Sequence, residues 1–333
     1  MIRLDDLVYD FLRKHSLLNV PGVLAVSGGP DSLALATAFI EKSGEVGIPP
    51  IHLAHFNHKL RGADSDADES FVNDFAARFH VPFRSTQCDI AAAACEAKAN
   101  LEETARTARY GWLADVTREV GARWIATGHT ADDQAETILH HFLRGAGIRG
   151  LGGMPEVREL KPGIALVRPL LGLLRADVLA YLAKRNLTPR HDATNDDVDR
   201  TRSRLRHETI PALSAQFNPA LIEVVGRLGE QCREVQSLID SLAGDLLIRA
   251  ELPRAGDMCI VRAPTIADAS PILAAEAFRL IWRREGWPMG EMNYDDWRHL
   301  AVLARQTKGA RDFPGPIHVR RVGGVIQLSR RLM

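Results

Sequence analysis

The stretch VLAVSGGPDSLALA, from Val23 to Ala36, decides the fold of this chain. Its first four residues form a short apolar run, which is typical of a strand buried on both faces. From Leu33 to Ile40 the apolar spacing widens to that of a helix. The turn between them, Ser27–Ser32, contains Gly28 and Gly29, which can adopt positive φ values and let a ligand approach the backbone. Because the first N–H groups of a helix have no partner within it, this turn predicts an anion-binding site.

Further apolar runs, separated by helical patterns, follow this stretch: IHLAHFNH, VPFRSTQ, RWIATGH and IALVRPL. The alternation predicts an α/β fold, a doubly wound parallel sheet covered by helices. In such sheets, ligands bind outside the carboxyl ends of the strands. Polar clusters follow three of the predicted strands, at Ser27–Ser32, His55–Arg61 and Gly128–Glu136. We therefore expect these clusters to form one site.

The pattern changes in the second half of the chain. Helical segments dominate from about Arg202 to Leu247, and the tail GPIHVRRVGGVIQLSRR alternates around a Gly-Gly pair, as in a hairpin. The sequence therefore predicts three parts: a nucleotide-binding catalytic domain at 1–205, a helical linker at 206–250 and a small α+β domain at 251–333.

Charge and cysteine content indicate which partners and which cellular compartment to expect. The 42 basic and 42 acidic residues cancel, but residues 150–333 hold 27 Lys and Arg against 22 Asp and Glu, which permits nucleic-acid binding. The four cysteines form no C-x-x-C pair, which indicates a reducing compartment without a disulfide framework. There is no apolar stretch long enough for a bilayer and no signal-peptide pattern at the start, so we expect a cytoplasmic protein without a membrane partner.

The acidic residue Asp31 indicates what the glycine turn binds. A phosphate loop of the Walker type would need a lysine after its last glycine, and this turn has none. A carboxylate beside bound phosphates is repulsive unless a cation intervenes, so Asp31 suggests Mg²⁺ carried in with a nucleoside triphosphate. Ser27 and Ser32 would add hydroxyl groups. The alternative is that Asp31 only stabilises the start of the helix electrostatically.

The segment GHTADDQAETILHHFLR has two interpretations. Thr130 and Asp133 have the spacing of a helix-capping pair, which would give the carboxylates a structural role. However, Asp132, Asp133 and Glu136 lie within five residues and repel one another, and a divalent ion would remove that repulsion.

Histidines and arginines supply further candidates. His52, His55 and His58 could suggest zinc, but residues three apart on a strand point to opposite faces. We expect the end of this strand to present His55, Asn57 and His58 to a nucleotide or substrate instead. Arg106 and Arg109, on a helix capped by Asn100, suit a shared ligand or a solvated face equally by their spacing. The alternating series Arg200, Arg202, Arg204 and Arg206 does not fit one helical face, so contact with tRNA phosphates is favoured over the usual solvated surface.

Taken together, these stretches resemble the tRNA(Ile)-lysidine synthases, of the N-type ATP pyrophosphatase (PP-loop) superfamily. The match runs almost continuously from Val23 to about Leu213, and GHTADDQAETILHHFLRGAGIRGLGGM is its most specific part. The resemblance implies a PP-loop, adenine nucleotide alpha hydrolase-like domain. It also implies an ATP-dependent ligation. ATP would adenylate the C2 carbonyl oxygen of the wobble cytidine in a tRNA(Ile) with a CAU anticodon, and free L-lysine would then displace AMP.

The resemblance also implies roles for particular residues. The ATP-binding residues would be Ser27, Gly28, Gly29, Pro30, Asp31, Ser32, His55 and Gly128. The catalytic residues would be Asp31, Asp132 and Asp133. Mg²⁺ would bind Asp31 and Asp133, with the choice between Asp132 and Asp133 left open. The tRNA would contact the small C-terminal domain and Arg61, Arg106, Arg109, Arg202, Arg204 and Arg206.

Three other functions share parts of this sequence pattern. A tRNA cytosine thiolase would share the adenylation step but would need cysteines spaced for an iron–sulfur cluster or a persulfide. A ligase of the GMP- or NAD-synthetase type would share the loop alone, and a nucleotide-sensing or tRNA-binding module would catalyse nothing. Longer members of the family carry two C-terminal domains, whereas we expect one modest unit after Leu247. The sequence allows a homodimer without requiring one.

Overall fold

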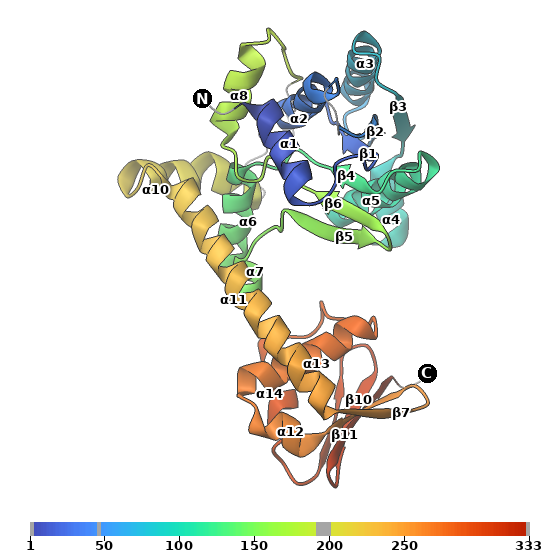
Figure 1. Ribbon diagram of the computed structural model, residues 1–333, viewed down its shortest axis with the longest axis vertical. Helices are drawn as coiled ribbons and strands as arrows, with labels where there is room; N and C mark the ends of the chain where they lie inside the picture. Colours follow the sequence, from blue (N-terminus) through green and yellow to red (C-terminus); the bar gives the residue numbers. More distant parts are fainter. Residues whose placement is uncertain (1–2, 45–47, 191–200, 331–333) are drawn as a thin grey trace. The chain divides into compact units, whose positions relative to one another are not determined.

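The computed structural model describes residues 3–44, 48–190 and 201–330. The chain forms two compact units, residues 1–230 and 231–333, which we describe separately. Figure 1 shows the elements of each unit in sequence colours. None of the helices in the described ranges combines the length and the apolar content needed to cross a bilayer.

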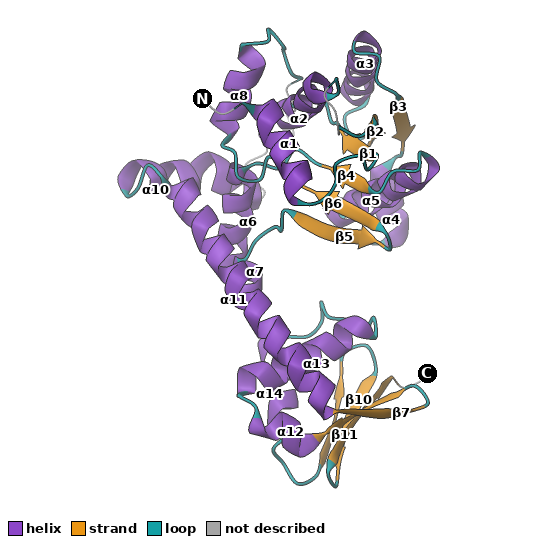
Figure 2. Cartoon of the chain, in the orientation of Figure 1, coloured by secondary structure: helices purple, strands orange, loops and turns teal. Residues whose placement is uncertain are grey.

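The first unit is built on a six-stranded sheet with strand order β3-β2-β1-β4-β6-β5, drawn in orange in Figure 2. Five strands are parallel, as predicted: β1 (Gly22–Ala25), β2 (Ile51–Asn57), β3 (Phe83–Gln87), β4 (Trp124–Ala126) and β6 (Ile164–Val167). The sixth strand, β5 (Val157–Lys161), was not predicted and pairs antiparallel with β6. Its sequence, VRELK, is short and contains three charged residues. Short strands with charged side chains are typical of the edge of a sheet, where β5 lies.

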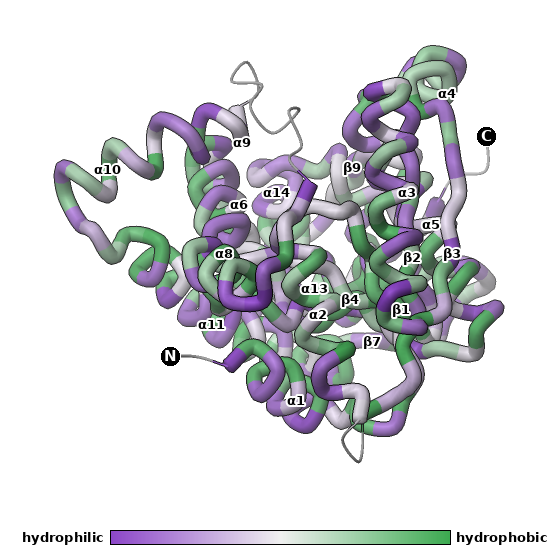
Figure 3. Tube along the Cα trace, turned by 90° about the horizontal axis from the view of Figure 1, so that it is seen from above, coloured by the Kyte–Doolittle hydropathy of each residue, from purple (hydrophilic) through white to green (hydrophobic). Residues whose placement is uncertain are grey.

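Helices cover both faces of this sheet, which confirms the doubly wound fold. On one face, α1 (Leu4–Lys14), α2 (Pro30–Lys42), α3 (Ala63–Arg78) and α8 (Arg175–Ala183) pack on Leu24, Leu53 and Trp124. On the other face, α5 (Leu101–Glu119) packs on Val23, Ala54 and Ile125. The neighbouring strand residues 23 and 24 thus enter different cores, as the period of two requires. In Figure 3, hydrophobic and hydrophilic residues alternate along α1, as on a helix with one buried face.

Local sequence sets the ends of these helices. The Asn100 side chain accepts hydrogen bonds from the backbone N–H groups of Glu102 and Glu103, 2.9 and 3.2 Å away, and this confirms the predicted cap of α5. The short helix α4 (Ile90–Ala97) precedes it and begins at Asp89, whose carboxylate accepts from Ala92 N.

Helices continue through the predicted helical segment. The helices α6 (Ala131–Leu143) and α7 (Ile148–Leu151) precede it, and the segment itself contains α9 (Thr201–Arg204), α10 (Ile210–Gln216) and α11 (Leu221–Ala250). Between α9 and α10, residues Leu205–Thr209 form one turn of π-helix, a geometry that is rare and often found at functional sites. The apolar residues Ala135 and Ile138 of α6 pack on Ile210 and Val225 and so fix this π-turn beside α6.

The second unit contains a five-stranded antiparallel sheet with strand order β7-β8-β11-β10-β9. Its strands are β7 (Glu251–Ala255), β8 (Met258–Arg262), β9 (Gly309–Phe313), β10 (Ile317–Val322) and β11 (Val325–Arg330). Val322 pairs with Val325 across the Gly-Gly turn, which confirms the predicted hairpin. The helices are α12 (Ala263–Asp268), α13 (Pro271–Arg284) and α14 (Tyr294–Leu303), and their core is centred on Trp282, which makes edge contacts with Trp287, Trp297 and Phe313.

Candidate active site

A pocket of about 770 Å³ lies at the carboxyl ends of β1, β2 and β4 in the first unit. All three predicted clusters reach it, the cluster after β2 through Phe56 and His58, together with residues from the π-turn. Ten of the predicted site residues line it: Ser27, Gly29, Pro30, Asp31, Ser32, Arg109, Gly128, Asp132, Asp133 and Arg206. Six do not: Gly28, His55, Arg61, Arg106, Arg202 and Arg204.

The glycine turn is held together by its two serines. Ser32 Oγ accepts from Ser27 N at 3.1 Å and donates to Gly29 O at 3.0 Å. Gly28 has φ +89°, as predicted, but the prediction for Gly29 was wrong: its φ is −70°, because it is the extended residue that precedes α2. Helix α2 has no side-chain cap, so its first N–H groups can bind an anion at the pocket wall.

Gly128 brings the end of β4 into contact with this turn. A Cβ atom at this position would lie 2.7 Å from the carbonyl carbon of Asp31 and 2.8 Å from the backbone nitrogen of Ser32. Contacts that short do not occur for real side chains, so only glycine permits the two backbones to approach this closely.

The carboxylate of Asp31 is buried in the pocket wall and poorly paired. Its Oδ1 atom has no hydrogen-bond partner, and Oδ2 lies 3.8 Å from Arg175 Nη1. Burial raises the pKa of Asp31 to about 6, although Arg175 opposes this effect. A buried carboxylate oxygen without a partner suits a cation ligand.

The two aspartates of α6 both bind backbone N–H groups. Asp133 Oδ2 accepts from Thr130 N at 2.9 Å in a complete capping box, which confirms the capping interpretation of this pair. Asp132 Oδ2 accepts from Arg175 N at 2.8 Å, at the start of α8. Both carboxylates nevertheless line the pocket.

Arg206 balances the charge of the remaining carboxylates. Its guanidinium group donates to Asp133 Oδ1 at 2.7 Å and to Glu136 Oε1 at 2.5 Å. Burial still raises the pKa of Glu136. Arg206, which the sequence assigned to tRNA, therefore lies inside the pocket and neutralises the repulsion that the sequence predicted. The π-turn carries it there.

The predicted histidines separate, as the strand period requires. His55 is buried and bonds Val26 O through Nδ1 at 2.9 Å, so it ties β2 to the end of β1 and does not line the pocket. His58 does line it, and burial together with Arg109 lowers its pKa to about 4. Among the residues that the structure describes, no three His, Cys, Asp or Glu side chains are arranged to hold a metal, so the zinc interpretation gains no support.

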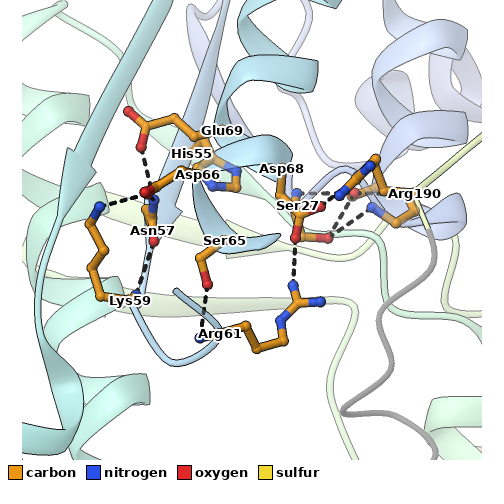
Figure 4. Close-up of polar contacts among 12 residues, drawn as sticks. Ser27, His55, Asn57, Lys59, Arg61, Ser65, Asp66, Asp68, Glu69 and Arg190 are labelled. Carbon is orange, nitrogen blue, oxygen red and sulfur yellow. Dashed lines mark hydrogen bonds and ion pairs between the residues drawn. The ribbon is translucent and has the colours of Figure 1, made fainter. Parts of the chain in front are cut away.

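Arg61 belongs to a separate network near the glycine turn, shown in Figure 4. It donates to Asp68 Oδ2 at 2.5 Å, and Arg190 Nε donates to Asp68 Oδ1 at 2.8 Å. The backbone N–H of Arg190 also donates to Gly28 O at 3.0 Å. Asp68 and Arg190 line the pocket and were missed by the sequence analysis, because nothing in the sequence links position 190 to position 28.

The other arginines of the alternating series lie outside the pocket. Arg202 is 3.7 Å from Glu102, and Arg204 is exposed and 3.8 Å from Glu208, one helical turn further on. Arg200 lies outside the described residues.

The fold and the turn define a class of nucleotide-binding protein. Residues 8–213 match the family model described as a PP-loop domain. A solved structure of the U34-tRNA thiolase NcsA from Methanococcus maripaludis superimposes with a TM-score of 0.54 and 17% identity, covering 69% of this chain and 80% of that one. At this identity, the likeness shows the fold alone.

Curated relatives then give the family. The tRNA(Ile)-lysidine synthase of Symbiobacterium thermophilum is 39% identical over 256 residues, 76% of this chain and 52% of that protein. The tRNA(Ile)-lysidine synthase of Geobacter sulfurreducens is 35% identical over 327 residues, 97% of this chain and 68% of that protein. The chain belongs to the tRNA(Ile)-lysidine synthase family of PP-loop proteins. It spans about half to two thirds of the length of these relatives.

The buried charge of Asp31 predicts a stabilising substitution. The folded pKa of about 6 exceeds the ordinary 3.8, so the folded chain holds this proton longer than the unfolded chain, and stability falls as pH rises between these values. We expect Asp31→Asn to raise the free energy of unfolding by about 3 kcal/mol at pH 7.5, without nucleotide or metal, and by little at pH 3.5. Urea denaturation at both pH values measures this. A variant less stable than wild type at pH 7.5 would mean that Asp31 has a structural partner.

The close approach at Gly128 predicts a local defect. Gly128→Ala must push the turn away from β4, and overpacking of this kind costs about 1–3 kcal/mol. We expect weaker ATP binding by calorimetry together with a lower melting temperature. The matched control is Gly147→Ala, where an added Cβ meets nothing within 4 Å and ATP affinity should be unchanged. Unchanged ATP affinity in Gly128→Ala would separate this contact from the nucleotide site.

Proposed function

We propose that this chain catalyses the ATP-dependent ligation of free L-lysine to C2 of the wobble cytidine in a tRNA(Ile) with a CAU anticodon. The observation that carries the proposal is one pocket that joins the uncapped start of α2 to the carboxylates of Asp31 and α6, in a chain of this family. The product would be lysidine, with AMP and pyrophosphate released.

The proposed chemistry has two steps. The C2 carbonyl oxygen of the cytidine attacks the α-phosphorus of ATP, the bond to the β-phosphate breaks, and pyrophosphate leaves. The ε-amine of lysine then attacks C2, loses a proton and expels AMP. Adenylation is needed because a carbonyl oxygen is a poor leaving group and AMP is a good one.

The glycine turn would hold the phosphates of ATP. The proposed contacts are the N–H groups at the start of α2 and the backbone of Ser27–Ser32, where the helix dipole favours an anion. In this arrangement Gly28 and Gly128 shape the backbone, and Pro30 begins the helix. His55 would act through the backbone of Val26 and not by touching ATP.

Mg²⁺ fits the residues present. Asp31 Oδ1 is buried without a partner, and Mg²⁺ in nucleotide sites is held by one or two carboxylates plus phosphates and not by a cage of protein ligands. We propose Asp31 and Asp133 as the carboxylates that hold it; at Asp133 it would compete with Arg206 for Oδ1. Asp132 keeps one carboxylate oxygen without a partner among the described residues and is the alternative ligand. When bound, the ion would neutralise charge on the phosphates during transfer.

The tRNA would contact arginines around the pocket and the second unit. Carboxylates already hold Arg61 and Arg206, and Arg109 lies on the pocket wall. In contrast, the side chains of Arg202 and Arg204 are exposed. As a tRNA-modifying enzyme with isolated thiols, the protein would act in the cytoplasm; a homodimer stays a prediction.

Two rival functions have less support. All four cysteines are free, and no group of three metal-ligating side chains occurs within the described ranges, so the iron–sulfur chemistry of a thiolase has no evident place. A small-molecule ligase would not use the exposed arginines near the pocket.

Mass spectrometry of the tRNA tests the proposal. After incubation of unmodified tRNA(Ile) with ATP, lysine and the enzyme, the wobble cytidine should gain the mass of lysine minus water. Asp31→Asn should give no gain although it folds. Replacement of oxygen by sulfur would indicate a thiolase, and pyrophosphate release without tRNA would indicate a small-molecule ligase; either result would contradict the proposal.

A charge-removing variant separates the two roles of Asp133. Asp133→Asn keeps an oxygen that can cap α6 but loses the charge, so we expect turnover to fall by at least about 100-fold with little change in melting temperature. The matched control is Asp296→Asn in the second unit, since Asp296 occupies the same position in a capping box and also bonds an arginine, Arg311. Full activity in Asp133→Asn would leave this residue only its capping role.

A salt series tests the exposed arginines. If Arg204 contacts a tRNA phosphate, Arg204→Ala should flatten the slope of log affinity against log salt by about one contact. ATP affinity should not change. Arg13→Ala is the control, because Arg13 is equally exposed and also paired within its own helix, with Asp10. Equal slopes for wild type and Arg204→Ala would assign Arg204 to the solvated surface.

A further inference from the structure

Four arginines surround the side chain of Tyr110, and we call these five residues the Tyr110 cluster. The guanidinium carbons of Arg106, Arg109 and Arg158 lie 4.9, 5.2 and 5.9 Å from the centre of the tyrosine ring. Arg168 follows β6, and its charge is near enough to Arg158, Arg106 and Tyr110 to interact with all three. Only Arg106 and Arg109 of this cluster were predicted from the sequence as site residues.

No carboxylate of residues 3–44, 48–190 or 201–330 balances the positive charge of the Tyr110 cluster. Within the described part of the chain, none of the four arginines forms an ion pair with a carboxylate. Elsewhere in the first unit, half-buried arginine side chains are paired: Arg206 with Asp133 and Glu136, and both Arg61 and Arg190 with Asp68. Contacts with one aromatic ring are worth about 0.5–1 kcal/mol each and do not replace a counter-charge.

Two members of the cluster, Arg168 and Tyr110, bury polar atoms that have no hydrogen-bond partner. Arg168 is 2% exposed; one of its nitrogens donates to Pro155 O at 2.6 Å, while Nε is buried without any partner. The hydroxyl of Tyr110 is also buried without a partner. Burying a cation without an anion costs several kcal/mol, so an arginine here needs a compensating function.

The cluster faces the pocket through Arg109, which lines it beside His58 and His129. Burial, together with the charges of Arg168, Arg109 and Arg106, lowers the pKa of His129 to about 4, although Asp133 opposes this effect. The pocket thus holds the carboxylates of Asp31 and α6, and Arg109 connects it to the Tyr110 cluster.

We propose that the Tyr110 cluster is a phosphate-binding subsite that holds a backbone phosphate of the tRNA beside the nucleotide being modified. Arg106, Arg109 and Arg158 are half-buried and can present their planar donors to the oxyanion, while Arg168 and Tyr110 position them from below. Three accessible guanidinium groups exceed what the single carboxylate of lysine needs. The phosphates of ATP have their own place at the start of α2. The inference rests on the proposed function, because it takes tRNA as the substrate.

Arg158→Gln tests the subsite with little risk to the fold, since Arg158 is half-buried on the edge strand β5 and has no ion pair. Binding of unmodified tRNA(Ile) is measured by fluorescence across a salt series. We expect the log–log slope to fall by about one contact, with ATP affinity and the KM for lysine unchanged. Arg118→Gln is the control: Arg118 lies on the same helix as Arg106 and Arg109 but pairs with Asp115, and its slope should equal that of wild type.

The other outcomes overturn the inference in distinguishable ways. A wild-type slope with a raised KM for lysine would assign the cluster to the lysine carboxylate. A wild-type slope with weaker ATP binding would assign it to the triphosphate. If Arg158→Gln melts well below wild type, Arg106→Gln replaces it, and a wild-type slope in both variants means a structural cluster. If Arg158→Gln shows the predicted slope change but the wild-type enzyme never adds lysine, the proposed function is refuted and the phosphate subsite still stands.

Discussion

The site depends on one unbalanced charge, the carboxylate of Asp31 at the start of α2. Burial raises its pKa to about 6, one of its oxygens has no partner, and the nearest cation, on Arg175, is 3.8 Å away. Such a group destabilises the ligand-free chain at neutral pH, and a cation that binds there would relieve the cost. The helix start beside it favours an anion, so a metal–nucleotide complex satisfies both groups together.

The remainder of the pocket is arranged around that charge. Gly128 permits the contact that brings the end of β4 against the turn, and α6 then places Asp132 and Asp133 opposite Asp31. Arg206 balances Asp133 and Glu136, whereas the arginines of the Tyr110 cluster pair with no carboxylate in the part of the chain that the structure describes. The pocket therefore contains groups of both charges, which suits a reaction among a nucleotide, a cationic amino acid and a polyanion.

The sequence predicted the elements that depend on residues close together in the chain. The apolar run after Gly22 gave the first strand, and Asn100 and Thr130 gave two helix starts that the structure confirms. What it could not predict depends on contacts between distant segments. The bond from Arg190 to Gly28 joins positions more than a hundred residues apart, and Arg206 reaches Asp133 only because a π-turn redirects it. The edge strand β5 was missed because its side chains are too polar to show a buried run.

The central claim is that this pocket transfers the adenylyl group of ATP to tRNA, and isotopic labelling tests it most directly. Unmodified tRNA(Ile) is incubated with the enzyme and ATP labelled at either the α- or the γ-phosphate, without lysine, and the tRNA is then isolated. The account predicts that the α label, and not the γ label, is found on the tRNA and is released as AMP when lysine is added. Transfer of the γ label, or an α label that lysine does not release, would contradict it.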